Sequence, residues 1–314
     1  MKEKIVIKDN LYRVYMKNIK DINYLSSEQK HHLINVLRLK NGDFISIFNQ
    51  IDGEFYAEIK FKGRNEYIVE KIYQLEKSPD KKNNKAYLCF SLLKLSNNSL
   101  VIEKATELGI DGLFPIISDK CIVRTINIEK INRIAIGATE QSNRLTIPNI
   151  YDVQTIHQNL DILINNKNNN IYNNIKSENN ILNNNIKSEN NIESCFNNKN
   201  TIIIFEIPSK IKLYQEINQK FLIKPLLEWI IEESSLKNRI KKIISNYFVY
   251  IGPEGGWSDK DRQTFIDYAL ISNNLSDNKT EFIVITVSEN IMRAETACIA
   301  AASWICSLTK YLNS

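Results

Sequence analysis

Hydrophobic and polar residues alternate in three short stretches near the start of the chain. The stretches comprise residues 44–48, 54–61 and 66–73, and glycines stand between them. A two-residue period bounded by glycine turns predicts strands with one buried face. Residues 1–78 are therefore expected to form a small β-rich domain.

A helical pattern precedes these strands at residues 27–39. Leu33, Val36 and Leu37 are expected to share one face of this helix. The other face carries basic side chains, and two adjacent histidines cannot reach one metal ion from a helix. Surface or RNA-contact roles are therefore favoured over a metal site for His31, His32 and Arg38.

A polar stretch that begins at Ser78 and Pro79 marks a domain boundary, so residues 79–314 are assigned to a second domain. Beyond it, short apolar runs alternate with segments of helical spacing, which is typical of an α/β domain. The predicted strands are residues 86–93, 113–117 and 201–206, and the predicted helices are residues 99–108, ended by Gly109, and 128–142.

Residues 159–200 are an Asn-rich tract that contains the sequence Asn-Asn-Ile-Lys-Ser-Glu-Asn-Asn-Ile twice, at 173–181 and 184–192. The tract has too few large apolar side chains to offset the entropy lost on ordering, so it is predicted to be a disordered surface insertion. Residues 208–246 hold amphipathic helical sequence, such as 226–231, and are a candidate second insertion.

Two strand-loop-helix units follow each other near the end of the chain. In the first, residues 247–251 are a predicted strand and the turn from Ile251 to Asp261 leads into a helix. In the second, residues 282–287 are the strand and 294–308 the helix. Two such units in succession predict neighbouring parallel strands whose loops meet at one edge of a sheet, which is the usual position of a ligand pocket.

The first of these loops is rich in glycine, which tolerates positive φ and lets a ligand approach the main chain. Ser258 and Asp261 after it resemble a capping box. The loop lacks the Gly-Lys-Ser/Thr of nucleotide triphosphatases and the Gly-x-Gly-x-x-Gly of dinucleotide turns. A tight structural turn and a backbone-lined pocket for an adenosine-type ligand both remain open.

Arg293 stands just before the last predicted helix, where a cation opposes the helix dipole. Either it pairs with Glu295 or Glu254, or it forms an anion site together with the helix N-terminus. The charged end of the helix at 128–142 also allows a structural and a functional interpretation. Glu140 and Arg144 are either solvated or lie at the border of the pocket.

The formal net charge of +5 permits a nucleic-acid partner without requiring one. The five cysteines are scattered, odd in number and without a Cys-x-x-Cys pair, which fits a reducing compartment, and none resembles a metal ligand. No apolar run has the length of a signal peptide core or a membrane span. A cytoplasmic protein is therefore expected, with an organellar location left open.

The two loops carry a resemblance to a known family. Residues 249–258 (Val-Tyr-Ile-Gly-Pro-Glu-Gly-Gly-Trp-Ser) and 291–297 (Ile-Met-Arg-Ala-Glu-Thr-Ala) resemble the cofactor loops of the RsmE family, whose members are SPOUT-class enzymes that methylate uridine N3 in small-subunit rRNA with S-adenosylmethionine. Residues 31–43, 104–109 and 140–148 also match. The resemblance covers both domains apart from the Asn-rich tract and much of 208–246.

The resemblance implies a PUA-like RNA-binding barrel followed by an α/β domain with a trefoil knot, and a homodimer that binds S-adenosylmethionine at the knot. It implies catalytic roles for Arg293 and, more weakly, Glu140 as base or orienter. The implied rRNA contacts are His31, His32, Arg38 and Arg144. The implied cofactor contacts are Ile251, Gly252, Pro253, Glu254, Gly255, Gly256, Val287, Ser288, Ile291 and Met292.

Two positions depart from the family pattern. Val287 and Ser288 stand where relatives have Leu-Gly, which is expected to narrow the second loop. Asn143 replaces a glycine, an easier change because asparagine tolerates left-handed backbone geometry. A catalytically silent ribosome-assembly protein and a SPOUT enzyme acting on tRNA are the two alternative functions.

Overall fold

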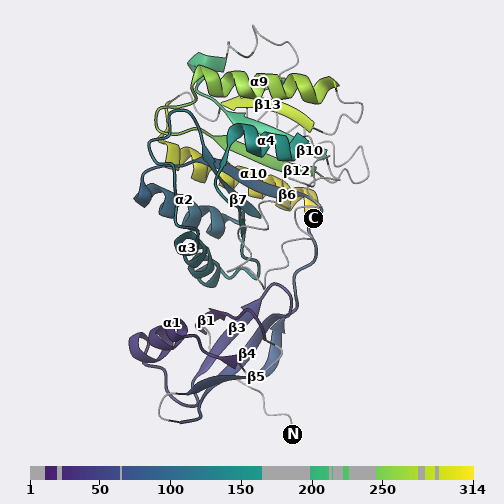
Figure 1. Ribbon diagram of the computed structural model, residues 1–314. Coiled ribbons are helices and arrows are strands. Elements are labelled where there is room, and N and C mark those ends of the chain that lie inside the picture. The colour runs from purple at the N-terminus through teal and green to yellow at the C-terminus, as the bar shows by residue number, and fades with distance from the viewer. Residues whose placement is uncertain are drawn as a thin grey trace. The chain divides into compact units, whose positions relative to one another are not determined.

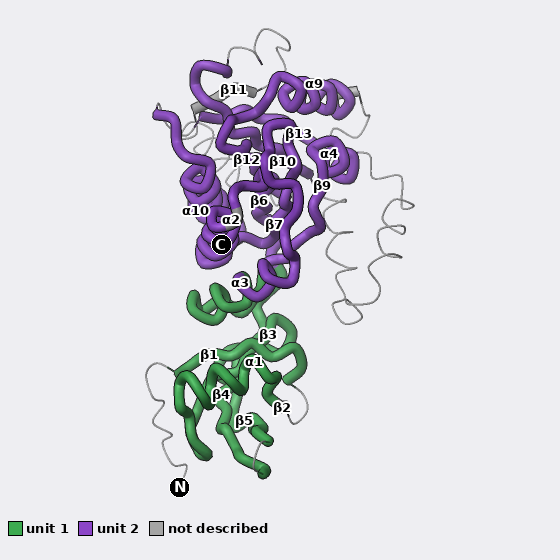
Figure 2. The backbone as a smooth tube through the Cα atoms, turned by 60° about the vertical axis from the view of Figure 1, so that its left-hand side comes forward, with its two compact units in different colours: residues 1–81, 135–147 green, residues 82–134, 148–314 purple. Residues whose placement is uncertain are grey.

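The computed structural model describes residues 11–19, 23–63, 66–164, 199–211, 214, 222–225, 245–274, 280–286 and 290–314. The chain forms two compact units, which Figure 2 colours separately. The first unit comprises residues 1–81 and 135–147, and the second comprises 82–134 and 148–314. Residues 135–147 thus pack with the N-terminal unit, although the chain enters the second unit before reaching them.

The first unit is built on a five-stranded sheet with the order β1-β3-β4-β5-β2. Its central strands are antiparallel, whereas β1 runs parallel to β3 at the edge. The three strands predicted from the sequence are confirmed as β3, β4 and β5, although buried and exposed residues do not alternate strictly along them. Buried residues such as Ile45, Ile47 and Ile59 form the core of the unit. The bounds are β1 Arg13–Tyr15, β2 Asn23–Tyr24, β3 Phe44–Asn49, β4 Gly53–Phe61 and β5 Tyr67–Glu76.

The helix predicted at 27–39 was only partly right. A four-residue α1 (Ser27–Lys30) continues directly into a π-helix, η1 (His31–Val36). Because a π-helix has more residues per turn than an α-helix, the 3.6-residue period no longer brings the apolar residues to one face. Leu33 is buried, whereas Val36 and Leu37 are 55% and 38% exposed.

The second unit contains an eight-stranded sheet of parallel strands with the order β11-β13-β10-β12-β6-β7-β8, and β9 also pairs with β7 (Figure 1). The predicted α/β architecture is confirmed. The strands are β6 Lys85–Ser91, β7 Gly112–Ile117, β8 Asn149–Ile150, β9 Gln154–Thr155, β10 Lys199–Phe205, β11 Leu222–Pro225, β12 Ser245–Ile251 and β13 Thr280–Thr286.

Helices cover both faces of this sheet. In Figure 1, α4 and α9 lie on one face, and α2 and α10 lie on the other. Gly109 ends α2 with a φ of 105°, as the sequence predicted. No described helix is both long and apolar enough to span a membrane. The helices of the chain include α2 Leu95–Leu108, α3 Ile128–Gln141, α4 Ile156–Ile164, η2 Pro208–Lys210, α9 Asp259–Asn274 and α10 Ala294–Asn313.

The strands β12 and β13 are not neighbours, which corrects the arrangement expected from their succession in the chain. The strand β10 lies between them and pairs with both, so that Ile203 stands opposite Val249 on one side and Ile283 on the other. Hydrophobic periodicity identifies strands but does not specify their order in the sheet. Because all three strands are parallel, their carboxyl ends still lie at the same edge.

The predicted limits of the Asn-rich insertion, residues 159 and 200, are wrong at both ends. Residues up to 164 complete α4, residues 199 and 200 belong to β10, and residues 165–198 lie outside the described structure. Asn159 is fully buried, but the Tyr250 hydroxyl donates to its side-chain oxygen and its amide donates to Gln154 at 2.8 Å. A buried asparagine with such partners is compatible with a packed helix.

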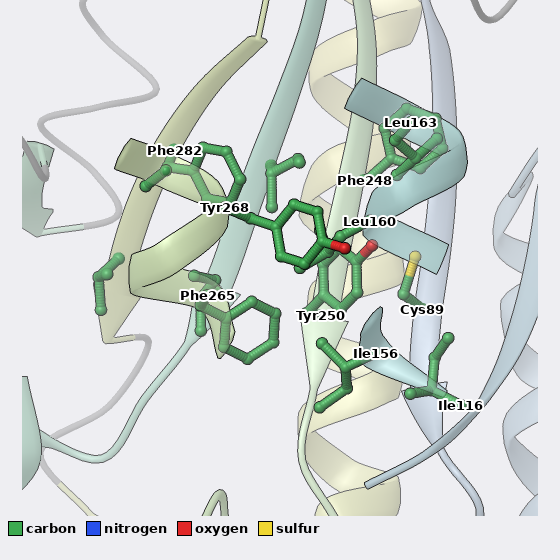
Figure 3. Packing of buried hydrophobic residues seen from close by; sticks show 14 of the residues in the cluster. Cys89, Ile116, Ile156, Leu160, Leu163, Phe248, Tyr250, Phe265, Tyr268 and Phe282 are labelled. Atoms are coloured by element: carbon green, nitrogen blue, oxygen red, sulfur yellow. The ribbon is translucent and has the colours of Figure 1, made fainter. Parts of the chain in front are cut away.

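Described residues within 208–246 also contribute to the fold. The strand β11 extends the sheet by pairing with β13, and Tyr214 is buried in the core. The amphipathic stretch at 226–231 lies outside the described residues. The core itself joins side chains of α4 and α9 to those of the sheet. Figure 3 shows Ile156 and Leu160 beside Tyr250, with Phe265 and Tyr268 next to them.

The position of Leu160 allows a test of whether α4 belongs to the core. Leu160→Ala removes a fully buried side chain, so it should lower the free energy of unfolding of the second unit by about 2–5 kcal/mol. Leu100→Ala is the matched control, because the same atoms are removed from a residue that is 38% exposed. Urea denaturation of both variants measures the difference. Equal midpoints would place the segment from residue 159 outside the core.

Candidate active site

The glycine turn at the end of β12 is built around Trp257. This side chain is 1% exposed, and its Nε1 donates to the Phe205 carbonyl at 2.9 Å, at the end of β10. Gly252 lies against the indole so closely that a Cβ atom there would be 3.2 Å from Cδ2 and Cε2. Gly256 has a φ of 63°, and its N–H donates to the Pro253 carbonyl at 2.8 Å. The glycines are therefore required by packing and by backbone geometry.

The capping box predicted after the turn is confirmed. The Ser258 N–H donates to the Asp261 carboxylate at 2.9 Å, and the Asp261 N–H donates to Ser258 Oγ at 3.1 Å. The second oxygen of Asp261 accepts the Asp119 N–H at 3.1 Å. The carboxylate thus fixes the start of α9 and also holds the loop that follows β7.

Two further contacts hold the glycine turn from outside. Lys120 Nζ donates to the carbonyls of Gly255 and Trp257, at 3.0 and 3.3 Å. Glu254 accepts the Lys94 N–H at 3.4 Å, just beyond β6. Sequence reasoning missed Lys120, since a single lysine in a polar loop gives no periodic or motif signal.

A buried ion pair connects α9 to the end of β10. Arg262 donates to both oxygens of Glu206, at 2.7 and 3.2 Å, and the two side chains are 8% and 2% exposed. The Tyr214 hydroxyl also donates to Glu206 at 3.3 Å, and burial raises the pKa of this tyrosine. A buried charge is costly unless it is paired and hydrogen-bonded, and these three side chains meet that condition together. No local sequence pattern predicts this pairing.

The second predicted loop ends at Arg293, the N-cap residue of α10, with φ and ψ of −65° and 151°. Its side chain is exposed and has no hydrogen-bond or ion-pair partner among the described residues, so the ion pairs considered with Glu254 and Glu295 do not occur there. Ile291 is 78% exposed and Met292 half-buried. The predicted contacts Val287 and Ser288 lie outside the described residues.

The polar end of α3 lies in the first unit. Glu140 accepts the Tyr15 N–H at 2.9 Å, and Arg144 Nη2 donates to Thr146 Oγ1 at 3.2 Å. Burial raises the pKa of Glu140, although the Tyr15 N–H and Arg13 oppose the shift. Asn143 has a φ of 56°, the left-handed geometry expected of it. Glu140 therefore belongs to one unit and the other predicted catalytic residue, Arg293, to the other.

The basic residues of η1 and the turn after it are exposed. His31 is hydrogen-bonded to Asn35 at 3.1 Å, and Arg38 has a φ of 57°. The Tyr12 hydroxyl lies 2.6 Å from His32 Nε2, with the two ring centroids 5.3 Å apart. Tyr12 was missed because its partner is twenty positions away in the sequence. Among the described residues, no group of three or more His, Cys, Asp or Glu side chains is placed to hold a metal ion.

Comparisons with known proteins identify the family. The family described as "RNA methyltransferase domain" matches residues 80–205 and 204–306, and the "RNA methyltransferase PUA domain" matches residues 25–72. A ribosomal RNA small subunit methyltransferase E from Rickettsia conorii is 30% identical over 286 residues, which cover 90% of this chain and 88% of that protein. The chain belongs to the ribosomal RNA small subunit methyltransferase E family. The resemblance seen in the cofactor loops is thereby confirmed.

Solved structures of similar proteins support the same fold. A ribosomal RNA small subunit methyltransferase E from Neisseria gonorrhoeae, bound to S-adenosyl methionine, has a TM-score of 0.62 at 20% identity and covers 95% of this chain and 98% of its own. A methyltransferase from Legionella pneumophila, in complex with the same cofactor, has a TM-score of 0.63 at 20% identity and the same coverage. The trefoil knot stays a prediction.

The contact between Gly252 and Trp257 predicts a difference between two glycine substitutions. Gly252→Ala should destabilise the protein by about 1–3 kcal/mol, because the hydrogen-bonded indole cannot move away from the added methyl group. Gly137→Ala in α3 should instead stabilise it by about 0.4–1 kcal/mol, since nothing lies within 4 Å of its Cβ position. Thermal melting of the two variants gives the comparison, and a Gly252→Ala melting temperature at or above that of the wild type would contradict it.

Proposed function

We propose that this protein transfers a methyl group from S-adenosylmethionine to N3 of a uridine in small-subunit rRNA. Membership of the family carries the proposal, since its members are named for rRNA methylation and similar structures contain the cofactor. The position of the methyl group on the base is the finer part of the proposal. It rests on the resemblance of residues 249–258 and 291–297 to the cofactor loops.

The glycine turn fits the adenosine part of the cofactor. Gly255 is exposed, Gly252 and Gly256 are half-buried, and none of them has a side chain that would keep a planar ring from the main chain. Ile251 and Pro253 are buried beside them and provide an apolar wall. When bound, the cofactor supplies an electrophilic methyl group. Ile291 and Met292 at the other loop are proposed to complete the site, together with Val287 and Ser288.

Arg293 is the residue best suited to the chemistry of the acceptor. Uridine N3 loses its proton before or during methylation, and the resulting negative charge spreads over the neighbouring carbonyl oxygens of the base. A guanidinium that has no partner among the described residues, placed at the N-terminus of α10, can donate to such an oxygen. Glu140 is the proposed base or orienter, because a raised pKa makes its carboxylate a better proton acceptor.

The first unit is proposed to hold the rRNA. N3 lies on the Watson–Crick edge of uridine, so the target base must be unpaired or flipped out of a helix. The pair of half-buried Tyr12 and exposed His32 offers aromatic surface for stacking, while His31, Arg38 and Arg144 add polar and charged groups for the backbone. A homodimer, as the family resemblance implies, and a location with the ribosomes of the cytoplasm or an organelle complete the proposal.

The reaction can be tested with purified protein, S-adenosylmethionine and unmodified small-subunit rRNA, either free or in reconstituted subunits. We expect one mole of 3-methyluridine per mole of rRNA, identified by mass spectrometry of the nucleosides. Methylation of a tRNA pool in its place would favour the alternative SPOUT activity. A protein that binds rRNA but gives neither product nor heat on titration with S-adenosylmethionine would be a silent assembly factor.

Arg293→Ala should reduce kcat by about 100-fold or more, since one charge-stabilising donor is lost from the transition state. The dissociation constant for S-adenosylmethionine should stay within about threefold, because the glycine turn is untouched. Lys310→Ala removes an exposed cation from the other end of α10 and serves as the matched control. Single-turnover methylation and calorimetry measure the two effects. Wild-type kcat in Arg293→Ala would remove Arg293 from the mechanism.

A further inference from the structure

Arg13 on the edge strand β1 is a buried cation, and all five N–H groups of its guanidinium are hydrogen-bonded. Its Nε and Nη2 donate to the two oxygens of Glu54, at 2.9 and 3.0 Å, and the Arg13 side chain is only 8% exposed. The guanidinium carbon lies 4.2 Å from the centre of the Phe48 ring. This pairing uses only two of the five N–H groups of arginine, and burial of the charge is offset only where the remaining donors are also hydrogen-bonded.

The other three N–H groups bind main-chain carbonyls at the end of α3. Nη1 donates to Thr139 O and Glu140 O, at 3.1 and 3.2 Å, and Nη2 donates to Arg144 O at 2.9 Å. The last carbonyls of a helix have no partner within the helix, and a positive charge is favourable there. Arg13 therefore caps the end of α3 from a strand 126 positions earlier in the chain.

A second residue of β1 makes the same connection. Because β1 is at the edge of its sheet, its outer N–H groups lack a strand partner, and that of Tyr15 donates to the Glu140 carboxylate at 2.9 Å. The strand thus holds both the backbone and the side chain of Glu140. These contacts explain why residues 135–147 pack with the first unit, whereas residues 128–134 of the same helix belong to the second.

We infer that Arg13 is a positioning residue, which makes Glu140 and Arg144 part of the RNA-binding unit. The inference rests on the proposed function of that unit and of Glu140. In this scheme the first unit both binds the target RNA and holds the polar end of α3. Binding of the rRNA to this unit therefore also fixes the position of Glu140 relative to the RNA. Arg13 does not touch substrate or cofactor in this scheme. Its effect is exerted through the three carbonyls that it binds.

Arg13→Lys separates this role from the ion pair. An ammonium has only three N–H groups on one atom, so it can stay near Glu54 but cannot bind all three carbonyls as well. We expect kcat to fall by about tenfold or more, with the affinities for unmodified small-subunit rRNA and S-adenosylmethionine within about threefold of wild type. Ile59→Val is the control, because it weakens the core of the same unit at a residue that pairs with Val69 on β5, whereas Arg13 pairs with Ser46 on β3. A kcat of Arg13→Lys equal to that of this control would overturn the inference.

Amide hydrogen exchange gives a readout that does not depend on activity. If Arg13 holds the end of α3, exchange at residues 139–144 should be about tenfold faster in Arg13→Lys and unchanged in Ile59→Val. Unchanged exchange in Arg13→Lys would overturn the positioning role even if methylation were normal. Failure of the wild-type protein to methylate rRNA would refute the proposed function, and the exchange experiment would still decide whether Arg13 fixes this segment.

Discussion

The hydrogen bond from the Trp257 indole to the Phe205 carbonyl is the contact on which the candidate cofactor turn depends. It joins the end of β12 to the end of β10, the strand that also separates β12 from β13. The indole provides the surface on which Gly252 lies, and the Arg262 and Glu206 pair ties α9 to the end of the same strand β10. A turn with few side chains of its own is thereby given a fixed shape by buried groups beneath it.

The contacts on the outer side of the turn come from different strands. Lys120 follows β7 and Lys94 follows β6, and both donate to the turn or to its Glu254 side chain. Asp261 links the N-terminus of α9 to the loop of Lys120 through Asp119. Because the strands are parallel, these loops all leave the sheet at its carboxyl edge, which is why so many of them can reach one turn.

Most of the strands and helices could be predicted from the sequence, because their signals are local. The alternation of apolar and polar residues predicted β3 and β4. Gly109 indicated the end of α2, and Ser258 with Asp261 indicated the start of α9. Local signals failed where the geometry was unusual or the partner distant. The π-helix turned Val36 away from the expected face, and the order of β10, β12 and β13 depends on crossovers that periodicity does not encode.

The same contrast holds for the candidate site, where local motifs were predicted from the sequence and contacts between distant residues were not. The glycine turn and Arg293 were found because their residues are contiguous and chemically distinctive, whereas Lys120, Arg262 and Arg13 act across long separations in sequence. A lysine or arginine in isolation gives no indication of which carbonyl or carboxylate it will meet. The family resemblance identified the loops, but the contacts that hold them required the three-dimensional structure.

Opposing effects act on the Glu140 carboxyl group at the end of α3. Burial raises the pKa of its carboxyl above the value of about 4.3 in an unfolded chain, so the folded state binds the proton more tightly than the unfolded state does. The associated stability is present at low pH and is lost as the pH rises through the folded pKa. At neutral pH the charged Glu140 therefore lowers stability, even with Tyr15 and Arg13 opposing the shift. A carboxyl group with a raised pKa that is hydrogen-bonded to β1 is compatible with the proposed role of Glu140 as base or orienter.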